Sequence, residues 1–218
     1  MTRKILLMLL LIAPPIATAI VTRLQSQPRR FAEVVPGAIY RGGRPTPEQI
    51  RDLGRDRHIR TILSLLEDKS TPEDRDRRRA ARASNIRLMC IPMPGNGTAE
   101  FALLDMAADA IANPSNQPVF YHCAAGKQRS NAVLAAYRLR HCGWTLEQVI
   151  DELVEKYDLE KDGEEKPLMD YLARYASWLA VQQDRPSSGN ASAKARNRAQ
   201  QSSANLGRSP PASANTPQ

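Results

Sequence analysis

Short runs of apolar and β-branched residues alternate with helical patterns through the centre of this 218-residue chain. Three of the helical patterns follow a threonine that can cap them: Thr46 and Thr71 each precede a proline, and Thr145 forms a capping-box pattern with Gln148. Alternating strands and helices predict an α/β fold with a mostly parallel sheet flanked by helices. We expect strands within 38–40, 59–65, 86–91 and 118–122, and helices within 47–53, 72–83, 101–112, 130–141, 146–157 and 167–182.

The net charge of +8 belongs to the two ends of the chain rather than to its centre. Residues 1–30 carry five basic side chains and no acidic one, and residues 184–218 carry a net +4, which leaves −1 for residues 31–183. A near-neutral centre gives no reason to expect a nucleic-acid partner. Three cysteines are too few for a disulfide-stabilised small fold, and no Cys/His spacing is typical of a metal site. We therefore expect no metal and no cofactor.

The N-terminal segment has the composition of an export or anchoring signal. Two basic residues precede residues 5–21, which hold no charged side chain and end near Ala17-Thr18-Ala19, a sequence that suits a signal cleavage site. The same 17 residues are also close to the shortest length that spans a bilayer. We interpret residues 1–22 as a signal peptide or a membrane anchor and expect an exported or membrane-anchored protein.

The C-terminal segment differs from the centre of the chain in its amino-acid composition. Residues 184–218 are rich in Ser, Ala, Asn, Pro and Gln and contain almost no large apolar side chain. Such a segment cannot bury enough surface to offset the entropy of ordering, which predicts a disordered basic tail. The folded domain is therefore expected at residues 31–183.

The chemistry is concentrated where the strand at 118–122 ends. Cys123 follows this strand, a turn containing Gly126 comes next, and Arg129 and Ser130 open a helix. The backbone N–H groups of such a turn, together with the helix N-terminus, form an anion cradle in which a thiolate is stabilised. The planar fork of Arg129 can bind two oxygens of a phosphoryl group, and the Ser130 hydroxyl can donate a hydrogen bond to the sulfur.

The motif His122-Cys123-x5-Arg129-Ser130 resembles the phosphate-binding loop HCx5R(S/T) of the protein tyrosine phosphatase superfamily. Residues 35–45 and 137–147 also resemble segments of the small dual-specificity-like phosphatases of bacteria, plants and fungi, so the resemblance covers about residues 31–180. It implies a dual-specificity-phosphatase-like fold and hydrolysis of phosphate monoesters through a phosphocysteine.

The resemblance also implies a role for each residue of the loop. Cys123 is expected to attack phosphorus, Arg129 to bind the phosphoryl group, and Ser130 to assist breakdown of the intermediate. The expected substrate-binding positions, which tune the thiol or line the cradle, are His122, Ala124, Ala125, Gly126, Lys127 and Gln128.

Lys127 gives information about the class of substrate. A Gly-Lys pair in this loop is shared with phosphoinositide 3-phosphatases and with atypical enzymes that act on inositol pyrophosphates, and an extra cation suits a polyanion. A solvated lysine explains the residue equally well. We expect a phosphotyrosine or dual-specificity protein substrate, with an inositol phosphate or pyrophosphate as the alternative.

The general acid of the family is missing from its usual loop. Residues 90–99 contain no aspartate or glutamate, and the next carboxylates are Glu100 at a predicted helix start and Asp105 within that helix. Loss of a general acid typically costs about 10²–10⁴-fold, less when the leaving group is already acidic. The absence leaves open a phosphate-binding pseudophosphatase. A sulfur transferase or an arsenate reductase fits less well, because the former has a shorter loop and the latter carries it at the N-terminus.

Overall fold

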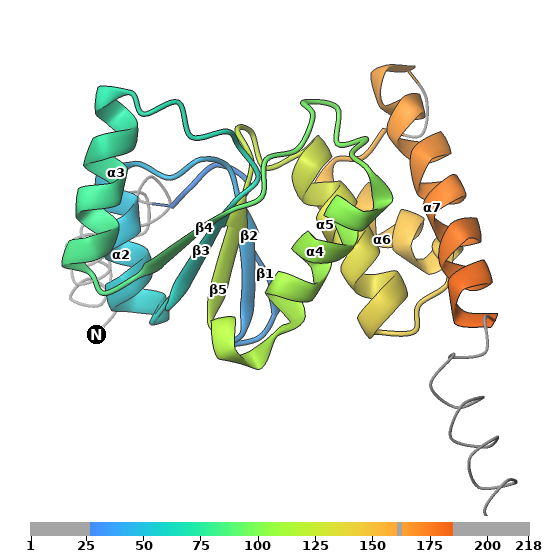
Figure 1. The fold of residues 1–218 in the computed structure, drawn as a ribbon, viewed down its shortest axis with the longest axis horizontal. Helices are drawn as coiled ribbons and strands as arrows, with labels where there is room; N and C mark the ends of the chain where they lie inside the picture. Colours follow the sequence, from blue (N-terminus) through green and yellow to red (C-terminus); the bar gives the residue numbers. More distant parts are fainter. Residues whose placement is uncertain (1–26, 161–162, 185–218) are drawn as a thin grey trace, which may run out of the picture. The chain divides into compact units, whose positions relative to one another are not determined.

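The computed structural model describes residues 27–160 and 163–184 of the chain (Figure 1). The described residues up to Ala176 belong to one compact unit, and Ser177 begins a second. The predicted export segment at 1–22 and the predicted tail from residue 185 onward lie outside the described residues. Asp184, the first residue of that tail, is the last residue of a helix. Within the described part, no helix is both long enough and apolar enough to cross a bilayer.

Five strands form one sheet in the order β1-β2-β5-β3-β4. Strand β1 pairs antiparallel with β2, and every other neighbouring pair is parallel, which confirms the predicted α/β fold with a mostly parallel sheet. The carboxyl ends of the parallel strands meet at one edge, where His122 pairs with both Gly42 and Ser64. The strands are β1 (Ala32–Val35), β2 (Ile39–Gly42), β3 (Thr61–Ser64), β4 (Arg87–Cys90) and β5 (Val119–His122).

The helices cover both faces of the sheet, with α2 and α3 on one face and α4 and α5 on the other (Figure 1). The predicted capping box at Thr145 is present, and Thr46, predicted as an N-cap, forms a second one. Each threonine accepts from the amide three residues ahead, where a glutamine side chain bonds back. The helices are α2 (Pro47–Arg57), α3 (Pro72–Ala83), α4 (Phe101–Ala112), α5 (Gln128–His141), α6 (Leu146–Tyr157) and α7 (Lys166–Asp184), with 3-10 turns η1 (Pro114–Asn116) and η2 (Gly163–Glu165).

Helix α5 is the central helix of the second face. Every residue from Ser130 to Ala136 is buried, because α5 packs between α4 and α6. On the first face, Ile50 and Leu53 of α2 pack with Ile62 and Phe120 of the sheet. The two cores hold β5 and α5 rigidly, and the loop that joins them is therefore anchored at both ends.

The structure corrects the sequence analysis in two places. Strand β1 was not expected, since its four residues include Glu33 and show no clear alternation. Helix α2 continues to Arg57 rather than ending at Leu53, because residues 54–57 keep the helical hydrogen bonds without an apolar side chain. His58 then ends the helix in the left-handed conformation, with φ of 54°, and its amide bonds to Leu53 O.

Candidate active site

The loop Cys123–Lys127 lies at the carboxyl edge of the sheet, the usual location of ligand sites in α/β folds. Cys123 directly follows β5 and is only 3% exposed. Beside it lies an open cleft of about 490 Å³, formed by the segments that follow β2, β3, β4 and β5. The cleft is lined by Arg44, Leu66, Glu67, Lys69, Pro92, Met93, Pro94, Ala124 and Arg129.

The sulfur of Cys123 is surrounded by hydrogen-bond donors. The Gly126 amide donates to Sγ over 3.2 Å, and the Ser130 hydroxyl donates over 3.3 Å. Burial alone would raise the pKa of the Cys123 thiol. The hydrogen bonds from the Ser130 hydroxyl and from the amides of Ser130, Lys127 and Gly126 outweigh burial, and the pKa is lowered. The arrangement therefore favours the thiolate, which is the nucleophilic form.

The carbonyl groups of the loop are bound from the outside. In a trans peptide the C=O and the following N–H point in opposite directions, so a carbonyl held outward aims the next amide inward. Four successive carbonyls are held in this way. Their partners are His122 Nδ1 for Cys123 O (3.2 Å), Arg44 N–H for Ala124 O (3.1 Å), Arg30 for Ala125 O (3.2 Å) and Arg41 for Gly126 O (2.9 Å).

His122 is buried beneath the loop and is neutral. Burial lowers its pKa to about 4. Its contact with Cys123 O requires the proton on Nδ1, because a carbonyl oxygen can only accept. His122 thus orients the loop as a neutral donor and carries no charge at neutral pH.

Arg129 stands at the start of α5 and lines the cleft. Its Nε is buried and has no hydrogen-bond partner among residues 27–160 and 163–184. A buried donor without a protein acceptor is unusual, and a fork of donors facing the cleft suits the oxygens of a phosphoryl group.

Gly126 is required by both its conformation and its surroundings. Its φ is +73°, and a Cβ atom at this position would lie 2.6 Å from Gly42 C and 2.7 Å from Gly43 N. The turn that follows β2 therefore packs directly against the cysteine loop. This contact explains why residues 42 and 43, a glycine pair far away in sequence, belong to the site.

The predicted loop residues come together around Cys123, whereas the two candidate acids do not. Glu100 is an exposed N-cap residue of α4. Asp105 accepts a hydrogen bond from the Tyr175 hydroxyl over 2.5 Å and pairs with Arg140 over 3.0 Å. Neither lines the cleft. The carboxylate that does line it is Glu67, which the sequence analysis did not consider.

The remaining predicted positions also belong to the loop. Ala124 is exposed, Ala125 is half-buried, and Gln128 begins α5. The backbone of Gln128 supports the loop that follows β4, because a Cβ atom at Gly97 would lie 2.9 Å from Gln128 O. The segment from Pro92 to Ala99, which contains no carboxylate, therefore lies against the start of α5.

Lys127 is paired with acidic groups of the segment before α7. Its Nζ lies 3.3 Å from Glu165 Oε1 and 3.5 Å from Glu160 Oε1. Burial would lower the pKa of Lys127, but the buried Glu165 outweighs it and the pKa is raised. In this conformation the Lys127 ammonium is held by Glu165 and Glu160, and the cations that line the cleft are Arg44, Lys69 and Arg129.

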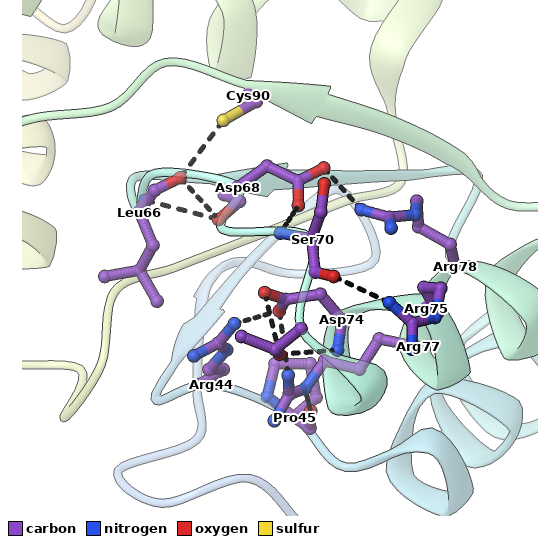
Figure 2. A network of polar contacts seen from close by, with 12 residues as sticks. Arg44, Pro45, Leu66, Asp68, Ser70, Asp74, Arg75, Arg77, Arg78 and Cys90 are labelled. Atoms are coloured by element: carbon purple, nitrogen blue, oxygen red, sulfur yellow. Dashed lines mark hydrogen bonds and ion pairs between the residues drawn. The ribbon is translucent and has the colours of Figure 1, made fainter.

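Arg44 joins the cleft to a neighbouring cavity of about 300 Å³ that it also lines. Figure 2 shows its guanidinium directed at Asp74, at the start of α3, which also pairs with Arg77 over 3.0 Å. Burial would raise the pKa of Asp74, but Arg44 and the Thr71 hydroxyl outweigh it and the pKa is lowered. Asp74 is thereby kept ionised and fixes the orientation of Arg44 at the edge of the cleft.

Replacement of Ser130 tests the cause of the lowered Cys123 pKa. We expect Ser130→Ala to raise the pH midpoint of Cys123 alkylation by iodoacetamide by about one pH unit, because a hydrogen bond to a charged group is worth about 1.5–3 kcal/mol. Peptide mass spectrometry separates Cys123 from Cys90 and Cys142. Ser115→Ala, on η1 at the opposite edge of the sheet, serves as the control and should leave the midpoint unchanged. An unchanged midpoint in Ser130→Ala would contradict the assignment.

Two glycine variants separate backbone strain from the contact at Gly126. Gly143 has a similar φ of +68°, but a Cβ atom there would meet nothing within 4 Å. Both Gly→Ala changes incur the strain of about 1–2 kcal/mol for a left-handed residue. Gly126→Ala must also displace the loop from the Gly42–Gly43 turn, and we expect its kcat/KM on p-nitrophenyl phosphate to fall about 10²-fold or more. Equal activity in the two variants would refute the role of the contact.

The family model of the tyrosine phosphatase family matches residues 26–193 of this chain. Inositol diphosphatase SIW14 of Saccharomyces cerevisiae is 30% identical over 129 residues, which make up 57% of this chain and 44% of the relative. The chain therefore spans less than half the length of that protein.

Solved structures share the fold. The core catalytic domain of the PP-IP phosphatase SIW14 from S. cerevisiae, in complex with citrate, is 26% identical with a TM-score of 0.57, over 68% of this chain and 87% of that chain. PTPMT1 is 16% identical with a TM-score of 0.58, over 72% of this chain and 99% of that chain. The match confirms the resemblance carried by residues 122–130: this chain belongs to the tyrosine phosphatase family and has the fold of the cysteine phosphatases.

Proposed function

We propose that this protein is a phosphatase that uses Cys123 to hydrolyse an inositol pyrophosphate or a closely similar polyanionic phosphate. The observation that carries the proposal is the position of the carboxylates. The segment from Pro92 to Ala99 has none, Glu100 does not line the cleft, and Asp105 is held by Tyr175 and Arg140. A site without a general acid on that segment suits a leaving group that needs no proton.

The leaving group decides between the substrates. A phosphoanhydride releases a phosphate whose pKa is about 6, whereas phosphotyrosine releases a phenol with a pKa of about 10. Only the former leaves readily as an anion at neutral pH. The proposal therefore places the inositol pyrophosphate ahead of the phosphotyrosine protein that the sequence analysis preferred.

The charge of the cleft supports the same choice. Among the described residues, Arg44, Lys69 and Arg129 line it together with a single carboxylate, Glu67. An excess of cations around an open cleft attracts a substrate that carries several phosphates. The likeness to a relative named as an inositol diphosphatase agrees with this substrate class.

The proposed reaction has two displacements at phosphorus. The Cys123 thiolate forms a sulfur–phosphorus bond as the bond from phosphorus to the leaving oxygen breaks, and the leaving group departs as an anion. Water then attacks the phosphocysteine, inorganic phosphate is released, and the sulfur leaves as a thiolate. Arg129 binds the phosphoryl oxygens in both steps, and the Ser130 hydroxyl, 3.3 Å from Sγ, stabilises the departing sulfur.

A leaving-group series tests the proposal. We expect kcat/KM to fall steeply from an inositol pyrophosphate and p-nitrophenyl phosphate to a phosphotyrosine peptide and then to a phosphoserine peptide, by about 10²-fold or more across the series. Steady-state release of inorganic phosphate by the full chain provides the measurement. Cys123→Ser should abolish turnover of every substrate.

Three variants control for an acid elsewhere, namely Glu67→Gln, Glu100→Gln and Asp105→Asn. A variant that loses about 10²-fold on the phosphotyrosine peptide, but little on p-nitrophenyl phosphate, would identify its residue as the general acid. A flat dependence on the leaving group would overturn the proposal. Phosphate binding without turnover of any substrate would identify a pseudophosphatase instead.

A further inference from the structure

Arg41 of β2 is fully buried, with 0% of its surface exposed, directly behind the cysteine loop. One terminal nitrogen donates to Gly126 O over 2.9 Å and to Asn131 Oδ1 of α5 over 2.6 Å. The guanidinium lies 4.2 Å from the ring centroid of Tyr157, at the end of α6. Arg41 therefore connects a strand, the loop and two helices.

The charge of Arg41 has no counter-ion in the described part of the chain. No carboxylate there forms an ion pair with it, and its Nε and its other terminal nitrogen have no hydrogen-bond partner. The buried Glu152 acts electrostatically on Tyr157, as Arg41 does. However, Glu152 forms its ion pair with Arg138, through two contacts of 2.8 Å. A buried cation without a counter-ion is unfavourable, so its charge is not explained by a contribution to stability.

The contact with Gly126 O has a direct consequence for the cradle. Because the C=O and N–H of a trans peptide point in opposite directions, a Gly126 carbonyl held by Arg41 turns the Lys127 amide toward the other side of the loop. That side is occupied by Cys123 Sγ, on which the Lys127 amide acts as a hydrogen-bond donor. Arg41 thus fixes one of the amides that face the sulfur.

We propose that Arg41 is a positioning residue of the phosphate cradle, which orients the Gly126–Lys127 peptide and supplies buried positive charge that a bound oxyanion neutralises. The inference rests on the cysteine-phosphatase assignment and holds for any phosphate substrate of this site. Arg41 acts through the loop and not by contact with the substrate. Arg129, whose fork faces the cleft, is the arginine that binds the phosphoryl group.

Two variants separate the charge from the hydrogen bond. Arg41→Lys keeps the charge, whereas Arg41→Gln keeps an uncharged donor near Gly126 O. We expect the inhibition constant of inorganic phosphate, measured against p-nitrophenyl phosphate, to rise about tenfold or more in Arg41→Gln, and to stay within about threefold of wild type in Arg41→Lys. The pH midpoint of Cys123 alkylation should rise in Arg41→Gln as well. The other groups that face this thiol are Ser130, His122 and Arg129, and because this variant leaves them unchanged, the rise reports on Arg41.

The neighbouring Arg138 provides the matched control. It is also largely buried, but its charge is neutralised by Glu152. Arg138→Met should lower the melting temperature, because the buried Glu152 loses both of its 2.8 Å contacts and keeps only Lys156 at 3.9 Å. It should leave the inhibition constant of phosphate unchanged in the folded protein. Wild-type inhibition by phosphate in Arg41→Gln would overturn the proposal, as would equal weakening in Arg41→Gln and Arg138→Met. If the variants show the expected inhibition constants but the protein does not hydrolyse inositol pyrophosphate, only the proposed substrate is refuted.

Discussion

The site depends on the orientation of four successive peptides that follow Cys123. Each carbonyl from Cys123 to Gly126 is bound from outside the loop, which turns the following amides inward, and those of Gly126 and Lys127 donate to the sulfur. Three of the four donors are arginines that belong to the segment 30–44, far from the loop in sequence. The thiolate is therefore stabilised by backbone groups whose direction is set by the N-terminal part of the domain.

The sheet makes this arrangement possible. Parallel pairing brings the ends of β2 and β5 to the same edge, with Gly42 opposite His122. Only glycine fits where the two following turns touch, because a Cβ atom at Gly126 would meet the backbone of residues 42 and 43. The cores on both faces then fix β5 and α5, and the loop between them is held at both ends. Such preorganisation is what electrostatic stabilisation of a transition state requires.

Local signals predicted much of this from the sequence. Helix α3 has the predicted bounds and begins where the Thr71 cap and Pro72 place its start, and the loop from His122 to Ser130 was found by its motif. Features that depend on distant partners were missed. The pairing of Lys127 with Glu165 joins residues 38 positions apart, and Glu67 reaches the cleft only because the segment after β3 meets the segment after β5. Neither contact leaves a pattern in the nearby sequence.

The central claim is that Cys123 becomes phosphorylated during turnover. Rapid acid quench of the full chain mixed with p-nitrophenyl phosphate, followed by peptide mass spectrometry, tests it most directly. The account predicts a phosphoryl group on Cys123 that forms before phosphate is released, and that accumulates further in Ser130→Ala because breakdown is slowed. Turnover of the substrate with no phosphoryl group on Cys123, or with the label on another residue, would contradict it.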